Sequence, residues 1–260
     1  MSLTDAKQRF SNRVADYVRY RPGYPAALMD VLRDECGLGS DHIIADIGSG
    51  TGILAKLFLE NGNRVFAVEP NDGMRGAGEE YLSRFRKFSS VNGSAENTTL
   101  SDGCVDFVVT GQAFHWFEPV AARAEFARIL RPGGLVVVIW NERLLDTTPF
   151  LRGYEALLQS FGKDYAQVSQ SYPRLAQIQA FFPHAITHKS FGNFQDFAFA
   201  ALAGRVRSSS YMPQEGDANF APMMAALREL FDTTQQSGRV RMDYRTQVYL
   251  GPLDAKRNSA

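Results

Sequence analysis

The feature that most constrains the fold is a glycine-rich turn between a short apolar run and a helical segment. The run is HIIADIG (42–48), the turn is DIGSGTG (46–52), and helical spacing follows from Ile53 to Asn61. Glycine takes positive φ without steric cost and lets a ligand approach the backbone closely. The free N–H groups at the start of the following helix favour a negative group such as a carboxylate. The segment therefore predicts a ligand-binding turn between a strand and a helix.

The rest of the first half repeats this strand–helix alternation. Almost continuously apolar strands are typical of a parallel sheet that helices cover on both faces. Right-handed crossovers between such strands favour the doubly wound fold. We expect strands at 42–48, 64–70, 88–92, 104–111 and 135–141, and helices at 10–20, 25–36, 53–61, 73–86 and 118–130.

The alternation ends after Asn141. Residues 149–182 are mainly helical in pattern and rich in aromatic residues, and the remaining segments continue as a strand, two helices and a strand. The last of these, 240–251, alternates polar and apolar residues, which is typical of an edge strand. We expect these further elements at 184–191, 193–205, 218–236 and 240–251.

The domain organisation follows from this pattern. We expect an N-terminal helical cap over 1–36 and a cofactor-binding core over 37–141. Residues 142–260 would complete the sheet and supply a helical insertion that covers the substrate.

Glu69 stands at the end of the second expected strand, seventeen positions after Gly52. An acidic residue at this place can accept hydrogen bonds from the two hydroxyls of a ribose. The dinucleotide fingerprint requires G-x-G-x-x-G, whereas this turn has G-x-G-x-G and Ile53 stands where the third glycine is needed. The spacing therefore favours a nucleoside without a pyrophosphate over NAD.

Composition limits the partners. Lys plus Arg and Asp plus Glu each number 28, so no net charge attracts the chain to nucleic acid or to an anionic membrane. The two cysteines, Cys36 and Cys104, lack metal-ligand spacing, and no stretch reaches the roughly 18 apolar residues of a membrane span. The N-terminal residues lack the apolar core of a signal peptide. We expect a cytoplasmic protein without a metal; the oligomeric state is not readable.

Five segments together resemble the class I S-adenosylmethionine-dependent methyltransferases, most closely the small-molecule branch that includes the trans-aconitate methyltransferases. The resemblance is clear over 10–141. It implies a Rossmann-like, mostly parallel seven-stranded sheet with helices on both faces, a C-terminal antiparallel edge strand and a helical insertion. It also implies S-adenosylmethionine as cofactor and S-adenosylhomocysteine as product. The segments are DIGSGTG (46–52), VEPNDGM (68–74), GSAEN (93–97), GQAFHWF (111–117) and LRPGGLVVV (130–138).

The resemblance implies a role for each matched position. The glycine-rich turn and Asp46 would hold the methionine portion, with Asp46 near its amino group, and Glu69 would bind the ribose. Residues on the next two loops would flank the adenine or lie at its edge. The implied cofactor-binding residues are Asp46, Gly48, Ser49, Gly50, Gly52, Glu69, Pro70, Met74, Ala95, Glu96, Gln112 and Ala113.

GQAFHWF places an imidazole and an indole on a loop at the carboxyl end of a central strand, where loops usually carry the chemistry. His115 is the candidate catalytic residue and, with Trp116, a candidate for substrate binding. The alternatives are that His115 only orders the loop through a hydrogen bond and that Trp116 packs in the core.

Two further segments resemble parts of the same branch. Tyr17, Tyr20 and Arg21 would close over the cofactor; alternatively they form a surface helix and turn. The segment from Arg205 to Tyr211 resembles one that borders the acceptor pocket, which makes Tyr211 a candidate substrate-binding residue; alternatively it is a solvated polar turn.

No motif marks the acceptor. Methyl transfer from a sulfonium needs alignment of the nucleophile and exclusion of water, and needs a base only if the acceptor is protonated. We expect a small-molecule acceptor with a carboxylate or a hydrophobic body, and no stable nucleic-acid or membrane partner. A nucleic-acid methyltransferase and a non-catalytic S-adenosylmethionine-binding protein are the alternatives. An NAD-linked oxidoreductase lacks both the glycine spacing and a Tyr-x-x-x-Lys motif.

Overall fold

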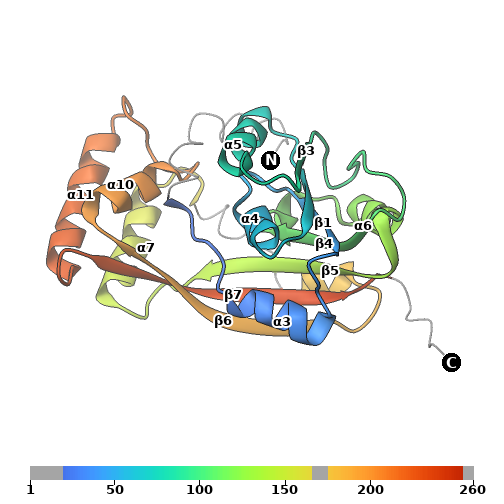
Figure 1. Cartoon of the computed structure of the whole chain (residues 1–260). Coiled ribbons are helices and arrows are strands. Elements are labelled where there is room, and N and C mark those ends of the chain that lie inside the picture. The colour runs from blue at the N-terminus through green and yellow to red at the C-terminus, as the bar shows by residue number, and fades with distance from the viewer. Residues whose placement is uncertain (1–19, 166–174, 254–260) are drawn as a thin grey trace. The chain divides into compact units, whose positions relative to one another are not determined.

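The structure is a computed structural model and describes residues 20–165 and 175–253 (Figure 1). A single seven-stranded sheet has the order β3-β2-β1-β4-β5-β7-β6. Its strands are β1 (Ile43–Ile47), β2 (Arg64–Val68), β3 (Phe88–Val91), β4 (Val105–Gly111), β5 (Leu130–Arg143), β6 (Thr187–Phe197) and β7 (Val240–Pro252).

The first five strands are parallel, as the alternating sequence predicts. β1 pairs with β2 on one side and with β4 on the other, and β4 pairs in turn with β5. The order therefore reverses between β1 and β4, which is the place where open α/β sheets bind ligands. β7 runs antiparallel to β5, and with the outermost strand β6 it forms the antiparallel edge of the sheet (Figure 1).

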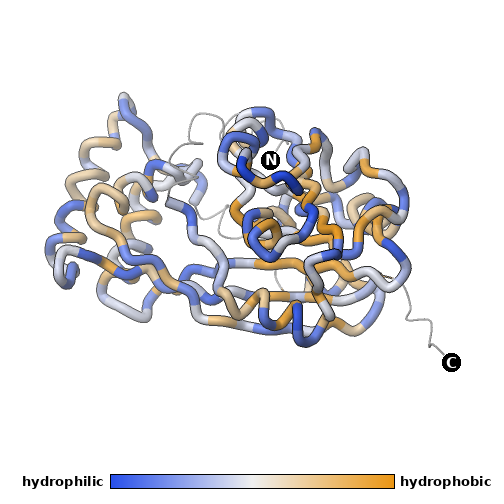
Figure 2. The backbone as a smooth tube through the Cα atoms, in the orientation of Figure 1, coloured by the Kyte–Doolittle hydropathy of each residue, from blue (hydrophilic) through white to orange (hydrophobic). Residues whose placement is uncertain are grey.

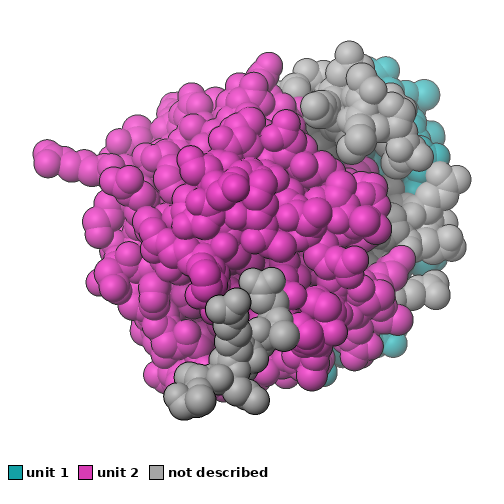
Figure 3. Space-filling view, turned by 90° about the vertical axis from the view of Figure 1, so that its right-hand side faces the viewer, with its two compact units in different colours: residues 1–22, 141–172, 192–245 teal, residues 23–140, 173–191, 246–260 magenta. Residues whose placement is uncertain are grey.

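The chain divides into two compact units, coloured separately in Figure 3. Unit 1 comprises residues 1–22, 141–172 and 192–245; unit 2 comprises 23–140, 173–191 and 246–260. Strands β5, β6 and β7 each contribute residues to both units. Consecutive stretches of sequence thus alternate between the units.

Unit 2 contains β1 to β4 and most of β5, and the side chains of these strands alternate between two hydrophobic layers. Ile44 packs with the layer that includes α3 and α4, whereas Ala45 packs with the layer that includes α6 and α9. Figure 2 shows the hydrophobic residues concentrated along the central strands. The helical elements of unit 2 are α3 (Ala27–Cys36), α4 (Ile53–Glu60), α5 (Asp72–Leu82), the 3₁₀ helix η1 (Phe114–Trp116), α6 (Pro119–Ile129) and α9 (Leu175–Phe181).

Unit 1 has its own core, built from helices and from the parts of the long strands that belong to it. Tyr154 of α7 and Leu227 of α11 are almost completely buried there, together with Met242 of β7. Among the described residues, the helices of unit 1 are α7 (Pro149–Phe161), α10 (Phe199–Arg207) and α11 (Phe220–Thr234).

Short polar side chains fix where several helices begin. The side chain of Asn71 accepts a hydrogen bond from Met74 N at the start of α5, and Thr148 does the same for Leu151 N at the start of α7. Pro119 and Pro149 occupy the first helical turn, where a missing N–H costs nothing.

Several element boundaries differ from those predicted. The strand expected at 184–191 is β6 and continues to Phe197, so the helix expected from 193 begins only at Phe199. Half-buried Phe191 and Asn193 alternate with exposed neighbours along β6. This alternation, which is typical of a strand, continues past residue 191, where the strand was expected to end. The strand expected at 135–141 is likewise part of the longer β5. The helix expected at 10–20 lies outside the described residues except for Tyr20.

Candidate functional site

The glycine-rich turn follows β1 and is held by the end of β2. Gly48 N and Ser49 N both donate to the carbonyl oxygen of Val68, at 2.9 and 3.1 Å, and Gly52 N donates to Ser49 O at 2.9 Å. Gly52 is the residue before α4 and has φ 82°, a conformation that an L side chain rarely adopts. These bonds shape the backbone into a tight turn that leads directly into the N-terminus of α4.

Glu69, the residue after β2, is hydrogen-bonded to this turn. Its Oε2 accepts from Gly50 N at 2.9 Å and its Oε1 accepts from Asn71 N at 2.8 Å. A carboxylate accepts about four hydrogen bonds, so its capacity exceeds these two bonds. The turn and the acid predicted to bind a ribose therefore form one connected structure.

Asp46 is completely buried in β1, one residue before the end of the strand. Neither of its carboxylate oxygens completes a hydrogen bond with the described residues. Burial raises the pKa of Asp46 to about 8; the backbone N–H of Ala55 lowers it and the charge of Glu69 raises it further. A buried carboxyl group of this kind is suited to a cationic ligand group.

Two loops beside the turn carry the residues predicted to contact adenine. Met74 is buried in the first turn of α5, and Pro70 precedes that helix. Ala95 is also buried, while the carboxylate of Glu96 accepts from Glu118 N at 2.9 Å. Glu96 thus connects its loop to the start of α6.

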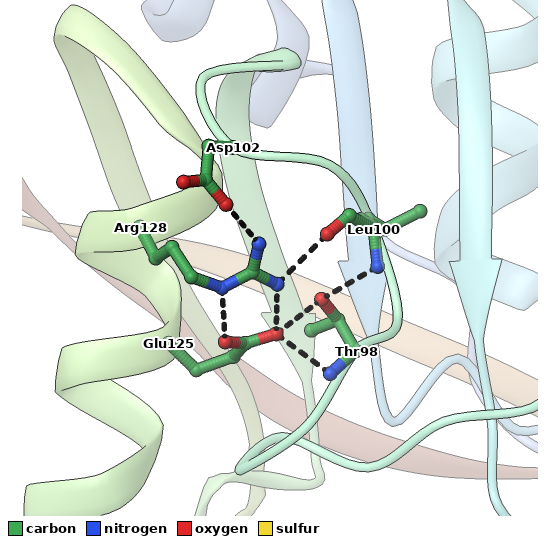
Figure 4. A network of polar contacts seen from close by, with 5 residues as sticks. All are labelled: Thr98, Leu100, Asp102, Glu125 and Arg128. Carbon is green, nitrogen blue, oxygen red and sulfur yellow. Dashed lines mark hydrogen bonds and ion pairs between the residues drawn. The ribbon is translucent and has the colours of Figure 1, made fainter.

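A buried polar network holds the end of the same loop (Figure 4). Glu125 Oε1 accepts from Thr98 N at 2.8 Å and from Thr98 Oγ1 at 2.6 Å. Arg128 donates to the carboxylate of Glu125 and to the carbonyl oxygen of Leu100, and its other edge pairs with Asp102. The hydrogen bonds from Arg128, with those from Thr98, hold the pKa of Glu125 at about 2. Helix α6 therefore fixes the loop that carries Ala95 and Glu96.

The residues after β4 form a compact loop. Gln112 has φ 60°, uncommon for a residue other than glycine, and its N–H donates to Ile139 O at 3.1 Å. Backbone conformations of this kind cluster at functional sites. Ala113 lies where a β-carbon on Gly48 would be, so the loop packs closely against the glycine-rich turn.

His115 lies in η1 between two tryptophans. Its ring centroid is 4.4 Å from that of Trp116 and 5.2 Å from that of Trp140 at the end of β5. Burial lowers the pKa of His115 to about 4, so its imidazole is neutral at physiological pH. Trp116 is 37% exposed, so it does not lie in the core.

The structure brings the predicted residues of the turn, of the two adenine loops and of the loop after β4 together in unit 2. Tyr20, Arg21 and Tyr211 belong to unit 1. There the Tyr20 ring packs against Gly204, Arg21 donates to Ser208 O at 3.2 Å, and Tyr211 contacts the ring of Tyr165. Tyr17 lies outside the described residues.

Unit 1 also contains a buried arginine, Arg205, and a partly buried one, Arg143, among tyrosines. Arg143 pairs with Glu155, which also accepts from the Tyr165 hydroxyl at 2.7 Å. Arg205 donates to Ser209 Oγ at 3.1 Å. The sequence alone did not single out Arg143, because its partners come from another element and only the folded chain brings them together.

Sequence reasoning also missed Tyr24, whose ring lies against Gly111 at the end of β4. The signal was present, since Tyr24 belongs to the RPGYP turn that precedes α3. A narrow recess with no room for a water molecule borders the glycine-rich turn; it is lined by Ser49, Gly50, Gly52, Ala67, Arg75, Gly78, Phe88 and Ser90.

Across the described ranges, no helix is both long and apolar enough to cross a membrane. In the same ranges, no three His, Cys, Asp or Glu side chains are grouped as ligands for a metal ion.

Comparison with known proteins gives consistent matches. Residues 45–138 match the family described as "Methyltransferase domain" (Methyltransf_11). An uncharacterised methyltransferase of Mycobacterium tuberculosis (strain ATCC 25618 / H37Rv) is 36% identical over 142 residues, which cover 55% of this chain and 56% of the relative. An uncharacterised methyltransferase-like protein of Schizosaccharomyces pombe is 34% identical over 156 residues, covering 60% and 59%. The chain thus spans less than two thirds of the length of these relatives.

Among solved structures, a candidate type II methyltransferase from Anaeromyxobacter dehalogenans has a TM-score of 0.65 at 21% identity, covering 90% of this chain and 98% of that one. This likeness shows the fold.

The fold and the sequence matches agree on one class: residues 45–138 are similar to methyltransferase domains, and the sheet has the Rossmann-like architecture of solved methyltransferase structures. The particular relatives that the chain resembles are themselves methyltransferases by name.

Proposed function

We propose that this protein transfers a methyl group from S-adenosylmethionine to a small-molecule acceptor in the cytoplasm. The observation that carries the proposal is the bonded pair of the glycine-rich turn and Glu69, placed at the carboxyl ends of β1 and β2. Parallel sheets bind ligands at these ends, and an acid after the second strand suits a ribose.

The residues present fit S-adenosylmethionine. Its amino group is a cation, and the buried carboxyl group of Asp46 completes no hydrogen bond with the described residues. Glu69 would bind the ribose hydroxyls, and buried Met74 offers a polarisable surface to the adenine. Ala95 and Glu96 would lie at the adenine edge, and Gln112 and Ala113 at the strand end.

When bound, S-adenosylmethionine supplies an electrophilic methyl group on a charged sulfur. The chain has to orient the acceptor and exclude water. Neutral His115 and half-exposed Trp116 are the residues that we assign to acceptor binding in unit 2. A neutral imidazole has one N–H to donate and one nitrogen that accepts, so it can bind a polar acceptor without adding positive charge near the sulfonium.

We propose that the acceptor carries a carboxylate. Within unit 1, taken by itself, the surroundings of Arg205 suit such a group. Its side chain is buried, its Nε has no hydrogen-bond partner among the described residues, and its electrostatic partners are the hydroxyls of Tyr154, Tyr211 and Tyr244. Burying an arginine without a carboxylate partner is costly, and guanidinium groups bind carboxylates through paired hydrogen bonds.

Calorimetric titration with S-adenosylmethionine, S-adenosylhomocysteine and NAD tests the cofactor. We expect micromolar binding of the two sulfur nucleosides and none of NAD. Absence of binding by both nucleosides overturns the proposed function.

A screen for methyl transfer to small mono-, di- and tricarboxylates tests the acceptor. The matched pair Arg205→Lys and Arg205→Met separates charge from packing. We expect the lysine variant to keep part of the activity and the methionine variant to lose it, while both still bind S-adenosylhomocysteine. Turnover with oligonucleotides alone would favour a nucleic-acid methyltransferase, and binding with no turnover on any acceptor would favour a non-catalytic protein.

A further inference from the structure

Tyr24 occupies the side-chain position of Gly111, the last residue of β4. A β-carbon built on Gly111 would overlap the Tyr24 hydroxyl oxygen and would lie 3.0 Å from the ring carbon Cζ. The same β-carbon would lie 3.2 Å from Cδ2 of Leu54. Any residue larger than glycine at 111 would therefore displace the tyrosine.

This position is at the ligand-binding edge of the sheet. Leu54 is the second residue of α4, directly after the glycine-rich turn, and Gly111 is the carboxyl end of the strand beside β1. The hydroxyl thus lies at the carboxyl end of β4, on the face of the sheet where Leu54 of α4 also packs, and β4 neighbours β1 where the order of strands reverses. That reversal is the place at which an open α/β sheet takes its ligand.

The ring is held firmly on its other sides. Tyr24 packs against the hydrophobic layer that contains Leu28 of α3 and Leu54 of α4. The next residue, Pro25, accepts a hydrogen bond from Leu28 N at 3.0 Å and so connects the tyrosine to the start of α3. A side chain fixed by packing on rigid helices presents its polar group at a defined place.

The backbone beside the hydroxyl is unusual as well. Glycine inside a strand weakens it and often marks close approach of another group. Gly111 is followed by Gln112 at φ 60°. Two successive residues at this strand end therefore have the features of a functional site.

We infer that Tyr24 is a positioning residue for the methyl-bearing sulfonium of the cofactor, with its hydroxyl oxygen accepting C–H···O contacts from the polarised methyl group. The inference rests on the proposed function. Weak hydrogen bonds of this kind orient a group without a strong charge. A carboxylate there would stabilise the charged sulfonium before the reaction more than in the transition state, where that charge is being lost. A neutral hydroxyl avoids this ground-state stabilisation.

Tyr24→Phe removes the oxygen and keeps the packing of the ring. The matched control is Tyr81→Phe, since Tyr81 lies exposed on α5 beside Lys56. We expect Tyr24→Phe to weaken binding of S-adenosylmethionine about two- to fivefold, as the loss of one weak hydrogen bond implies. Binding of S-adenosylhomocysteine, which lacks the methyl group, should change less than the binding of S-adenosylmethionine. The control should change neither constant.

NMR of S-adenosylmethionine with a ¹³C-labelled methyl group detects the contact between the methyl group and the Tyr24 hydroxyl. We expect the bound methyl proton resonance to move upfield in Tyr24→Phe and to stay in place in Tyr81→Phe. The inference is overturned if Tyr24→Phe weakens the binding of both nucleosides equally and leaves the methyl resonance in place. Tyr24 would then have only a structural role. If the wild-type protein binds neither nucleoside, the proposed function itself fails.

A double-mutant cycle tests the steric pair. Gly111→Ala should weaken binding of S-adenosylmethionine, and it should do so less in a Tyr24→Ala background, where the clashing hydroxyl is gone. Equal effects in both backgrounds would overturn the placement of the hydroxyl at Gly111.

Discussion

The carboxylate of Glu69 and the backbone N–H of Gly50, nineteen positions apart in sequence, are joined by a 2.9 Å hydrogen bond. The bond fixes the carboxylate beside the turn before any ligand arrives. A pre-oriented acceptor loses less conformational entropy on binding than a mobile one.

Glu69→Ala should therefore weaken cofactor binding strongly. Loss of charge-assisted hydrogen bonds costs about 1.5–3 kcal/mol, which raises the dissociation constant roughly ten- to a hundredfold. Titration calorimetry with S-adenosylhomocysteine measures this dissociation constant. Glu60→Ala, at the exposed end of α4, is the control and should leave binding unchanged. An unchanged constant in Glu69→Ala would remove Glu69 from the ribose site.

Asp46 should make stability depend on pH. Its pKa is about 8 in the folded protein and about 3.9 in an unfolded chain, so above pH 4 the folded state binds the extra proton. The free energy of unfolding should fall as pH rises from about 4 to 8, with a limiting slope of about 1.4 kcal/mol per pH unit from this group.

Asp46→Asn has no proton to lose and is the test of this dependence. Urea unfolding at pH 5 and pH 8 should show the variant gaining stability relative to the wild type as pH rises. Parallel pH dependences in the two proteins would mean that Asp46 is ionised in the folded state throughout.

Replacing Glu125 should lower the free energy of unfolding more than replacing Asp102, although both residues pair with Arg128. Glu125→Ala leaves the buried Thr98 N–H and hydroxyl without their acceptor, which costs about 1–3 kcal/mol of unfolding free energy. Asp102 is 81% exposed, so Asp102→Ala should cost less than about 1 kcal/mol. Chemical denaturation measures both. Similar costs for the two variants would contradict a role of Glu125 in holding the loop.

The low pKa of Glu125 gives this network a pH dependence of its own. The carboxylate contributes stability fully above its ordinary pKa of about 4.5, and that contribution is lost as pH falls through about 2. The wild type should therefore be more stable than Glu125→Gln at neutral pH, and this difference in unfolding free energy should disappear in strong acid. A difference in unfolding free energy that persists unchanged at pH 2 would contradict the low pKa of Glu125.

His115 should stay neutral over the physiological range. Its pKa of about 4 lies below the ordinary 6.5, so its imidazole resonances should not titrate between pH 8 and pH 5. Because the unfolded chain takes up a proton near pH 6.5, this residue's contribution to stability is present above that pH and declines toward pH 4. NMR of ring-labelled histidine, assigned with His115→Gln, measures the titration. A midpoint near 6.5 would mean that the ring is solvated.

The sequence predicted unit 2 well, because its elements are specified locally. Apolar strands such as β1 and β4, and the turn from Gly48 to Gly52, need only their own residues to be identified. The alternating side chains of β6 were equally local, yet its end was missed because no glycine or proline separates Phe197 from α10.

The contacts that define the candidate site could not be predicted from the sequence. Tyr24 and Gly111 are brought together only by the sheet, and no spacing rule links them. The same holds for Arg143 and Tyr165, which meet on Glu155 in unit 1. A sequence names the residue types available for such a cluster, whereas packing decides which of them meet.

The interleaving of the two units has a consequence for synthesis. Unit 2 includes Thr246 to Leu253, which follow the last segment of unit 1 in sequence, and β7 supplies Val248 and Leu250 to the hydrophobic layer beside α4. Domains made of one continuous stretch can fold while the ribosome is still extending the chain. Here the unit that carries the glycine-rich turn lacks a core strand until residues 246–252 have been translated, so its core is completed only after the segments of unit 1 have been synthesised.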